Sequence, residues 1–458
     1  MKGRKRILTT LITLTLTLLI SRIRIGFRPL SFAYEVVVIF VIWFSLVEMS
    51  VKHFRKYSLS DVFFYTHLSL ITLGGAFIGL SLPEIGPFMT PLYVPVALMS
   101  LLFNSEIALT SGLLLSAIAM YRWHMDVMLT LPFFLTAFIA SRTLSRADRR
   151  LDVLKSSVLT SLVLFGTHLF MKLGMKIEYT DYDLVAAVLN PIFSGILVLG
   201  ILPYVEYTSR LYSNLGLIEF GNLNHPLLKM LAMKSPGTYY HSVIVANLAE
   251  AAAEKIGANP ILARIGAYYH DIGKMKRPHF FTENIRDGKN PHEEITPSLS
   301  HLILNEHVKY GVELARKYRL PLLVEFIIPQ HHGTRSQKYF YYKAKQKFED
   351  IAEEEFRYPG PKPQFKEAAI IMLADSVEAA SRSLKNPSVS QIKECVEDVI
   401  SSIFFERQLD ESGITLSELE KISDAFLQVL VNIFSSRIEY PEEGKKQKVV
   451  RINDQNSR

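Results

Sequence analysis

The chain has 458 residues, of which 49% are hydrophobic, and a formal net charge of +7. This length allows two or three domains. The apolar residues are concentrated in residues 1–204, whereas residues 205–458 have the composition of an ordinary charged globular protein. The composition therefore predicts a membrane half followed by a soluble half. The single cysteine, Cys395, excludes an intramolecular disulfide and a thiolate zinc site, and it fits a reducing compartment.

Much of the positive charge flanks the apolar runs. This pattern is how membrane proteins set their orientation, and the residues concerned are Lys2, Arg4, Lys5, Arg6, Lys52, Arg55, Lys56, Arg142, Arg146, Arg149 and Arg150. We therefore expect a lipid bilayer as a partner and no nucleic-acid polymer.

The membrane half contains eight candidate transmembrane helices, identified as apolar runs near the length that crosses a bilayer. They lie at about 7–20, 33–51, 62–82, 88–103, 106–121, 126–141, 155–173 and 184–204. Eight spans place the basic N-terminus, the basic loops at 51–61 and 142–155, and everything after residue 204 in the cytoplasm. Arg22, Arg24 and Arg28 are the exception. We predict an N-terminal membrane anchor with a short extracellular link at 1–32 and a seven-span module at 33–204.

The soluble half is predicted to be helical, with no convincing strand. After a linker region at 205–235, we expect helices at 239–256, 260–273, 298–318, 321–332, 367–384, 388–408 and 415–436. Residues 274–297 and 357–363 are rich in Pro and Gly and are expected to be loops. The charged stretch 441–458 is predicted to be disordered. The fold class is therefore all-α, a polytopic transmembrane bundle followed by a cytoplasmic helical domain at 236–440.

Seven residues of the soluble half carry atoms suited to metal binding: His241, His270, Asp271, His307, His331, His332 and Asp375. Taken alone, His241 is better explained by packing or capping and His307 by a surface position, whereas the pairs His270-Asp271 and His331-His332 are harder to explain in this way. Asp375 follows the apolar run 368–374, where an unpaired carboxylate would be costly; a metal ion or a partner such as Arg382 would offset that cost. Together the seven offer imidazole and carboxylate without thiolate, the donor set of a two-metal hydrolytic site.

Two residues near the His270-Asp271 pair have distinct expected roles. Asp271 is the natural bridge between two metal ions. Lys274, three residues further along, either reaches a phosphate oxygen or faces solvent at the helix end. Four consecutive aromatic residues, Tyr339 to Tyr342, either stack on a base or pack against the domain.

Several motifs besides the ligands carry a resemblance to a known family. They are His270-Asp271-Ile272-Gly273-Lys274, Gln330-His331-His332-Gly333-Thr334, Tyr339-Phe340-Tyr341-Tyr342-Lys343, Tyr358-Pro359-Gly360-Pro361-Lys362-Pro363 and Leu373-Ala374-Asp375-Ser376-Val377-Glu378-Ala379-Ala380. In these motifs the chain resembles the HD-domain phosphohydrolases, and more narrowly their seven-transmembrane branch, the PgpH-type cyclic-di-AMP phosphodiesterases of bacteria. The likeness extends over roughly 33–440.

The resemblance implies an all-helical cytoplasmic HD domain with two iron or manganese ions. By motif, one ion would be held by His241, His270, Asp271 and Asp375, and the other by Asp271, His307, His331 and His332. The implied reaction is hydrolysis of cyclic-di-AMP to linear pApA by a metal-bridging hydroxide, which lowers the second messenger. Asp271 and Lys274 would be catalytic. The candidate substrate contacts are Lys274, Thr334 and Tyr342.

One departure from the family pattern concerns the segment after the first span. Family members usually carry a large extracellular domain there, whereas about 21–32 alone joins the first span to the seven-span module in this chain. We therefore expect a short form whose metal ligands are intact.

Three alternative functions stay open. The first is an HD hydrolase of cyclic-di-GMP, a nucleoside triphosphate or a guanosine polyphosphate alarmone. The absence of a Gly-Tyr-Pro tripeptide after Asp271 disfavours cyclic-di-GMP. The second is a membrane receptor that binds nucleotide without turnover, which the complete ligand set disfavours. The third is a transporter, disfavoured because the spans lack a polar pathway. Oligomeric state is open, a homodimer included.

Overall fold

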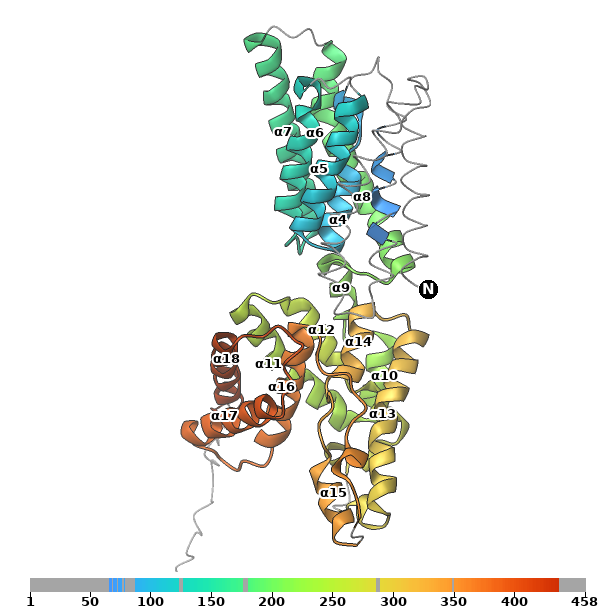
Figure 1. Cartoon of the computed structure of the whole chain (residues 1–458), viewed down its shortest axis with the longest axis vertical. Coiled ribbons are helices and arrows are strands. Elements are labelled where there is room, and N and C mark those ends of the chain that lie inside the picture. The colour runs from blue at the N-terminus through green and yellow to red at the C-terminus, as the bar shows by residue number, and fades with distance from the viewer. Residues whose placement is uncertain are drawn as a thin grey trace, which may run out of the picture.

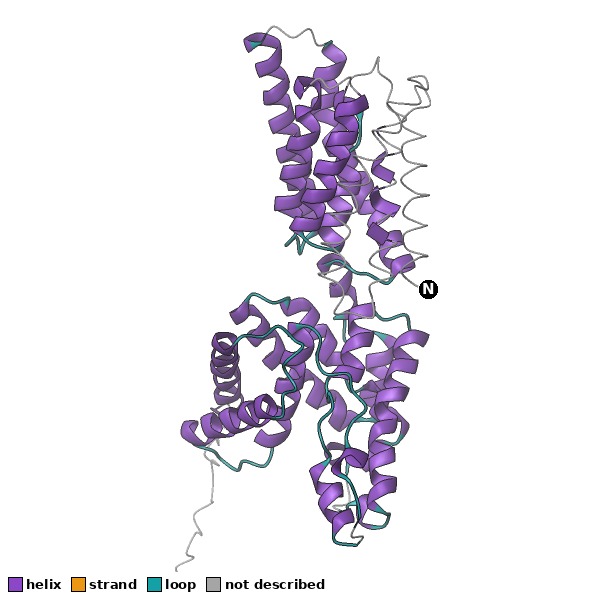
Figure 2. Ribbon diagram, viewed as in Figure 1, coloured by secondary structure: helices purple, strands orange, loops and turns teal. Residues whose placement is uncertain are grey.

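The computed structural model describes residues 66–435 except 68, 72, 76–77, 79–86, 123–126, 176–179, 286–288 and 348–349. Within this part the chain is helical, and its sole β-type pairing is an isolated bridge between Ser336 and Arg357. Figures 1 and 2 show two helical bodies arranged end to end along the long axis. The all-α prediction is confirmed. The expected anchor at 1–32, the span at 33–51 and the tail at 441–458 lie outside the described residues.

The first body is a bundle of helices that follow the short 3-10 turn η2 (Pro87–Met89). Its helices are α4 (Tyr93–Leu102), α5 (Ser105–Arg122), α6 (Val127–Leu144), α7 (Arg150–Gly174) and α8 (Asp181–Ser209). Helices α7 and α8 are long and apolar enough to cross a membrane, and the other three are shorter and apolar. Large apolar side chains on α7 and α8 are exposed, including Leu162, Phe170 and Phe193. An apolar outer surface is the arrangement that a lipid environment favours.

The second body holds one large apolar core built by helices from residue 214 onward. Its helices are α9 (Asn214–Phe220), α10 (Pro226–Lys234), α11 (Pro236–Ile256), α12 (Pro260–Tyr269), α13 (Pro297–Lys317), α14 (Leu322–Gln330), α15 (Lys338–Lys345), α16 (Lys366–Ser381), α17 (Val389–Phe405) and α18 (Leu416–Ser435). Helix α16 lies at the centre, because its run Ala368–Ala374 is buried on every side. Figure 1 shows α11, α12 and α16 side by side.

Local sequence explains where these helices begin and end. The Asn259 side chain accepts a hydrogen bond from the Leu262 backbone at 3.1 Å, and Pro260 occupies the first helical position of α12. Gly257 ends α11 with a left-handed φ of 69°. Helix α15 was not predicted from the sequence. Its alternation of lysine and aromatic residues lacks the long apolar stripe that announces a buried helix.

A polar junction joins the two bodies. At the end of α8, the Arg210 guanidinium donates to the Leu320 carbonyl at 2.6 Å and to Glu325 Oε2 at 2.7 Å. The Arg319 guanidinium donates to the Tyr207 carbonyl at 3.0 Å. These contacts hold the last turn of α8 against the start of α14, and the far end of α14 carries two of the predicted ligands.

Candidate metal centre

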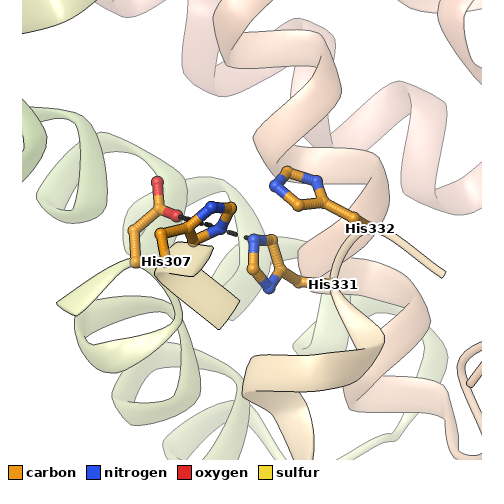
Figure 3. Close-up of side chains that lie close together, drawn as sticks. His307, His331 and His332 are labelled. Atoms are coloured by element: carbon orange, nitrogen blue, oxygen red, sulfur yellow. Dashed lines mark ion pairs between the residues drawn. The ribbon is translucent and has the colours of Figure 1, made fainter. Parts of the chain in front are cut away.

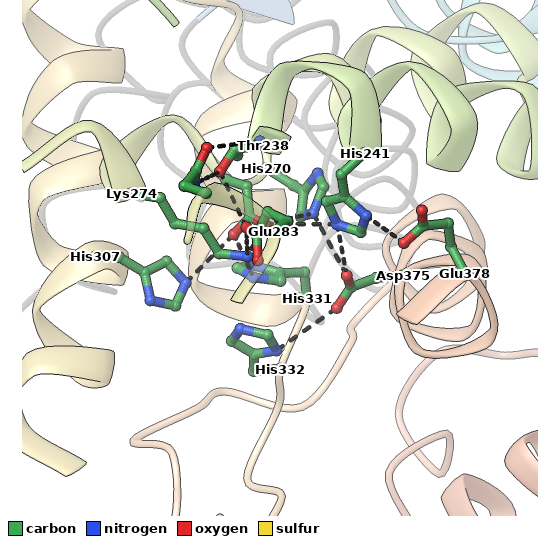
Figure 4. Close-up of polar contacts among 12 residues, drawn as sticks. Thr238, His241, His270, Lys274, Glu283, His307, His331, His332, Asp375 and Glu378 are labelled. Carbon is green, nitrogen blue, oxygen red and sulfur yellow. Dashed lines mark hydrogen bonds and ion pairs between the residues drawn. The ribbon is translucent and has the colours of Figure 1, made fainter. Parts of the chain in front are cut away.

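The seven predicted ligands come together at one point, although they belong to five segments of the chain. His241 lies on α11, His270 and Asp271 follow α12, His307 lies on α13, His331 and His332 follow α14, and Asp375 lies on α16. Figure 4 shows the five labelled histidines and Asp375 gathered around a common centre. Their ligand atoms form two groups, each within 4.8 Å, and these groups are His241, His270, Asp271 and Asp375, and Asp271, His307, His331 and His332.

Asp271 lies between the two groups and directs one oxygen at each. Its Oδ2 is 3.6 Å from His241 Nε2 and 3.3 Å from His270 Nε2. Its Oδ1 is 3.5 Å from the Nε2 atoms of both His307 and His331. Figure 3 shows His307, His331 and His332 adjacent to one another, with the ion pairs of the first two dashed. This is the geometry of a carboxylate that can bridge two cations.

Asp375 closes the first group and touches the second. Its Oδ1 is 3.0 Å from His241 Nε2 and 3.8 Å from His270 Nε2, and its Oδ2 is 3.8 Å from His332 Nδ1. The His332 ring also stacks on Tyr358, with ring centroids 4.2 Å apart.

A hydrogen bond at the other ring nitrogen orients each of the four deeply buried histidines. Nδ1 of His270 donates to the Ala267 carbonyl at 2.7 Å, and Nδ1 of His331 donates to the Ile328 carbonyl at 2.6 Å. His307 makes the same bond three residues back, to Leu304. For His241 the acceptor is Glu378, at 2.5 Å. With the proton on Nδ1, the Nε2 lone pair of each ring is free to bind a metal ion.

The atoms that face the centre make no hydrogen bonds among the described residues. They are Nε2 of the four histidines and both carboxylate oxygens of Asp271, and all are buried. Asp271 Oδ2 does form an ion pair with the Lys274 ammonium, at 2.6 Å. Buried polar atoms normally find a partner, because leaving one unsatisfied costs roughly 1–3 kcal/mol. A convergent set of such atoms, all of them good donors to a divalent cation, fits metal ions of the imidazole- and carboxylate-binding class.

The electrostatics of the centre also favour added cations. Burial lowers the pKa of His270, but Asp271 and Asp375 outweigh it and raise that pKa to about 10. Burial, which nearby carboxylate charge does not outweigh, lowers the pKa of His307 to about 3. Burial raises the pKa of Asp271, but Lys274 and His270 outweigh it and hold that pKa well below its usual range. The carboxylates therefore draw positive charge into a dry site.

Lys274 points into the centre and not to solvent. Its Nζ is 2.6 Å from Asp271 Oδ2 and 2.9 Å from Glu283 Oε1. Glu283 also accepts a hydrogen bond from the Thr238 hydroxyl at 3.0 Å. Glu283 was not predicted, because it lies in the expected loop at 274–297, where a carboxylate carries no local signal.

A second unpredicted carboxylate supports His241. Arg382 does not pair with Asp375 as the sequence suggested; instead its guanidinium forms a fork with Glu378, at 2.8 and 2.7 Å. Glu378 in turn accepts the Nδ1 proton of His241. The sequence feature that could have identified Glu378 is its position three residues after Asp375, which places both side chains on the same face of α16.

Gly273 allows this packing. A Cβ atom built there would lie 1.8 Å from the His307 carbonyl oxygen, so the turn after Asp271 can approach α13 only without a side chain. This close approach brings His307 beside Asp271.

A cavity of about 860 Å³ opens onto the centre. Its walls include the metal-side residues His241, Lys274, His332 and Asp375. They also include the aromatic residues Phe280, His292, Tyr339 and Phe340, and Ala379 and Arg382 near the end of α16. The predicted substrate contacts Thr334 and Tyr342 are not among its lining residues. Thr334 instead bonds Gln408, and Tyr342 is exposed.

Comparison with known proteins places both halves of the chain. Residues 29–213 match the family described as 7TM receptor with intracellular HD hydrolase, and residues 238–380 match the HD domain. The chain belongs to this seven-transmembrane HD family. The predicted resemblance is thus confirmed, and the protein is a membrane protein with an HD domain in its second half.

Individual relatives agree with this assignment. The cyclic-di-AMP phosphodiesterase PgpH of Bacillus subtilis is 39% identical over 79% of this chain and 52% of its own length. PgpH of Listeria monocytogenes is 37% identical over 78% of this chain and 50% of its own length. The solved L. monocytogenes PgpH HD domain in complex with cyclic-di-AMP is 49% identical, covering 46% of this chain and 99% of that one, with a TM-score of 0.45. The chain thus spans about half the length of the two full-length PgpH proteins.

Proposed function

We propose that this protein is a membrane-anchored, metal-dependent phosphodiesterase that hydrolyses one phosphodiester bond of cyclic-di-AMP, yielding linear pApA and lowering the level of this second messenger. The observation that carries the proposal is the position of Asp271, whose two oxygens face two separate groups of histidines whose ring nitrogens are free. Relatives named as cyclic-di-AMP phosphodiesterases supply the substrate class.

The two groups of ligands would hold two divalent ions, iron or manganese, which accept imidazole and carboxylate donors. When bound, such ions supply Lewis acidity to the phosphate and to the attacking water. Asp271 would serve both ions. The Nδ1 bonds to backbone carbonyls and to Glu378 fix the ring orientations in advance, so that little reorganisation is needed when metal enters.

The remaining side chains of the centre position the substrate phosphate. Lys274 lines the cavity and carries its ammonium beside Asp271, so it can contact a non-bridging oxygen of a phosphodiester held at the centre. Glu283 accepts hydrogen bonds from the Lys274 ammonium and from the Thr238 hydroxyl, and these bonds hold the Lys274 side chain in place. The catalytic roles of Asp271 and Lys274 and the contacts of Thr334 and Tyr342 stay predictions.

The membrane arrangement is part of the proposal. An N-terminal anchor at 1–32, a seven-span module at 33–204, a linker region at 205–235 and a cytoplasmic HD domain at 236–440 would place the centre where a soluble second messenger is found. Cysteine accessibility on either side of right-side-out vesicles tests this topology. A homodimer stays a prediction that light scattering of the purified protein tests.

The deciding experiment is a hydrolysis assay on the full chain in detergent. The protein is purified anaerobically with iron or manganese and given cyclic-di-AMP and cyclic-di-GMP in parallel, with products separated by chromatography. We expect conversion of cyclic-di-AMP to pApA that is lost in Asp271→Ala. Preferential cleavage of another nucleotide would move the substrate assignment within the HD hydrolases. Tight binding of cyclic-di-AMP without turnover by the metal-loaded protein would instead identify a receptor.

A further inference from the structure

One wall of the cavity is aromatic and lies away from the metal ligands. The ring of Phe280 is 5.2 Å from that of His292, His292 is 5.0 Å from Phe340, and Phe340 is 5.1 Å from Tyr339, measured between centroids. All four line the cavity. The residues come from η4 (Pro278–Phe280), η6 (Pro291–Glu293) and α15, so three separate segments build one aromatic wall.

Two members of this wall are buried and fixed in place, whereas Tyr339 is exposed. Phe340 and His292 are buried, and His292 Nε2 donates to the Phe280 carbonyl at 2.9 Å, which fixes the two loop segments to each other. Tyr339, by contrast, is 57% exposed although it contacts a buried ring. A large aromatic side chain that lines a cavity and remains open is the usual form of a stacking platform for a base.

Helix α15 offers an internal comparison. Tyr342 is 58% exposed, as open as Tyr339, but it lies outside the cavity. Lys343 Nζ is 5.7 Å from the Tyr339 ring centroid and thus steadies that ring through a cation–π contact. Exposure alone therefore does not set Tyr339 apart; its position on the cavity does.

We propose that this aromatic wall, with Tyr339 as its open member, is a subsite that stacks on one nucleobase of the dinucleotide while the phosphate lies at Asp271 and Lys274. The inference rests on the proposed function and deepens it. One continuous cavity contains both the metal-side residues and the wall, so a ligand with a phosphate and a planar base can span them. Stacking tolerates different bases, so the wall supplies affinity and positioning to purine dinucleotides in general.

The test uses the full chain in detergent, loaded with manganese, and compares steady-state hydrolysis of cyclic-di-AMP by four proteins: the natural sequence, Tyr339→Ala, Tyr339→Phe and Phe405→Ala. Phe405 lies on α17, is 79% exposed and does not line the cavity. Loss of one stacking contact is expected to raise KM about 5- to 100-fold in Tyr339→Ala. The value of kcat and the bound manganese should stay unchanged, because the wall touches no metal ligand. Tyr339→Phe keeps a ring and should keep the natural KM, and so should the control Phe405→Ala, which removes an exposed ring outside the cavity.

The outcomes separate this inference from the proposed function. Turnover by the natural sequence with the same KM in Tyr339→Ala would overturn the subsite and leave the function standing. An equal rise of KM in Phe405→Ala would also overturn the subsite, because the effect would then not depend on a ring that lines the cavity. Absence of turnover in the metal-loaded natural sequence would overturn the proposed function and the subsite together.

Discussion

The two bodies of this protein bury polar side chains in opposite ways. Within the described bundle the buried polar groups are mainly hydroxyls, and many bond a backbone carbonyl. Ser116 donates to the Gly112 carbonyl at 2.8 Å within its own helix, and Ser100 donates to the Ser141 carbonyl at 3.2 Å across helices. In the HD domain the buried groups include imidazoles and carboxylates, and the Nε2 atoms that face the centre make no hydrogen bond among the described residues.

The difference shows what a buried polar side chain indicates in each body. A hydroxyl beside a carbonyl is satisfied by the fold itself, so it indicates helix packing and little else. Histidine ring nitrogens that converge on buried carboxylates are instead the set of donors that a divalent cation would bind. This contrast predicts where substitutions and metal removal should have large effects and where they should have almost none.

The largest effect should follow from Asp271→Asn. The amide keeps the shape of the side chain but lacks the second negatively charged oxygen that lets Asp271 face both ligand groups. We expect cyclic-di-AMP hydrolysis to fall at least about 1000-fold, or about 4 kcal/mol, with fewer metal ions per chain by elemental analysis. Asp410→Asn, an exposed residue paired with Arg407, is the matched control. Full metal content and activity in Asp271→Asn would refute the bridging role.

Removal of metal should affect the two bodies unequally. Chelation leaves the buried atoms of the centre uncompensated, so the HD domain should lose about 2.7 kcal/mol relative to protein held at a hundredfold excess over Kd. Hydrogen exchange of the full chain would show this as faster exchange in α11, α12, α14 and α16, with α7 and α8 unchanged. Equal acceleration in α7 and α8 would break the comparison between the bodies.

The sequence could predict the ligands because each one belongs to a short local motif. His270 and His331 both follow the end of a helix, and each ring is turned by a carbonyl three residues back, so local chain geometry determines the orientation. The supporting residues were harder to find. Glu283 reaches Lys274 only because its loop packs against α11, where Thr238 also bonds Glu283. Tyr339 lines the cavity only because α15 packs beside His292. Neither placement leaves a periodic trace in the sequence.

The next prediction concerns Glu378, the carboxylate that orients the metal ligand His241. Glu378→Gln removes the charge that accepts the His241 Nδ1 proton but keeps the size of the side chain. Second-shell substitutions of this kind weaken metal binding about 10- to 100-fold. Titration of the full chain with manganese, followed by calorimetry, would measure it. The same change at Glu418, which pairs with Lys366 outside the centre, should leave the manganese affinity unchanged. An unchanged manganese affinity in Glu378→Gln would show that the charge of Glu378 does not support metal binding by His241.

The smallest effect is expected for two serines that differ only in their partners. Ser116→Ala removes a bonded hydroxyl from the bundle, but the Gly112 carbonyl keeps its helical N–H, so stability should fall by no more than about 0.5 kcal/mol. Ser300 is fully buried on α13, and its hydroxyl makes no hydrogen bond among the described residues. Ser300→Ala should therefore be neutral or stabilising by up to about 1 kcal/mol, because it removes an unsatisfied group. Thermal unfolding of the full chain in detergent would measure both. A clear loss of stability in Ser300→Ala would mean that an unsatisfied atom in the HD domain is no guide to a missing ligand, and the inference from the orphaned nitrogens around Asp271 would weaken with it.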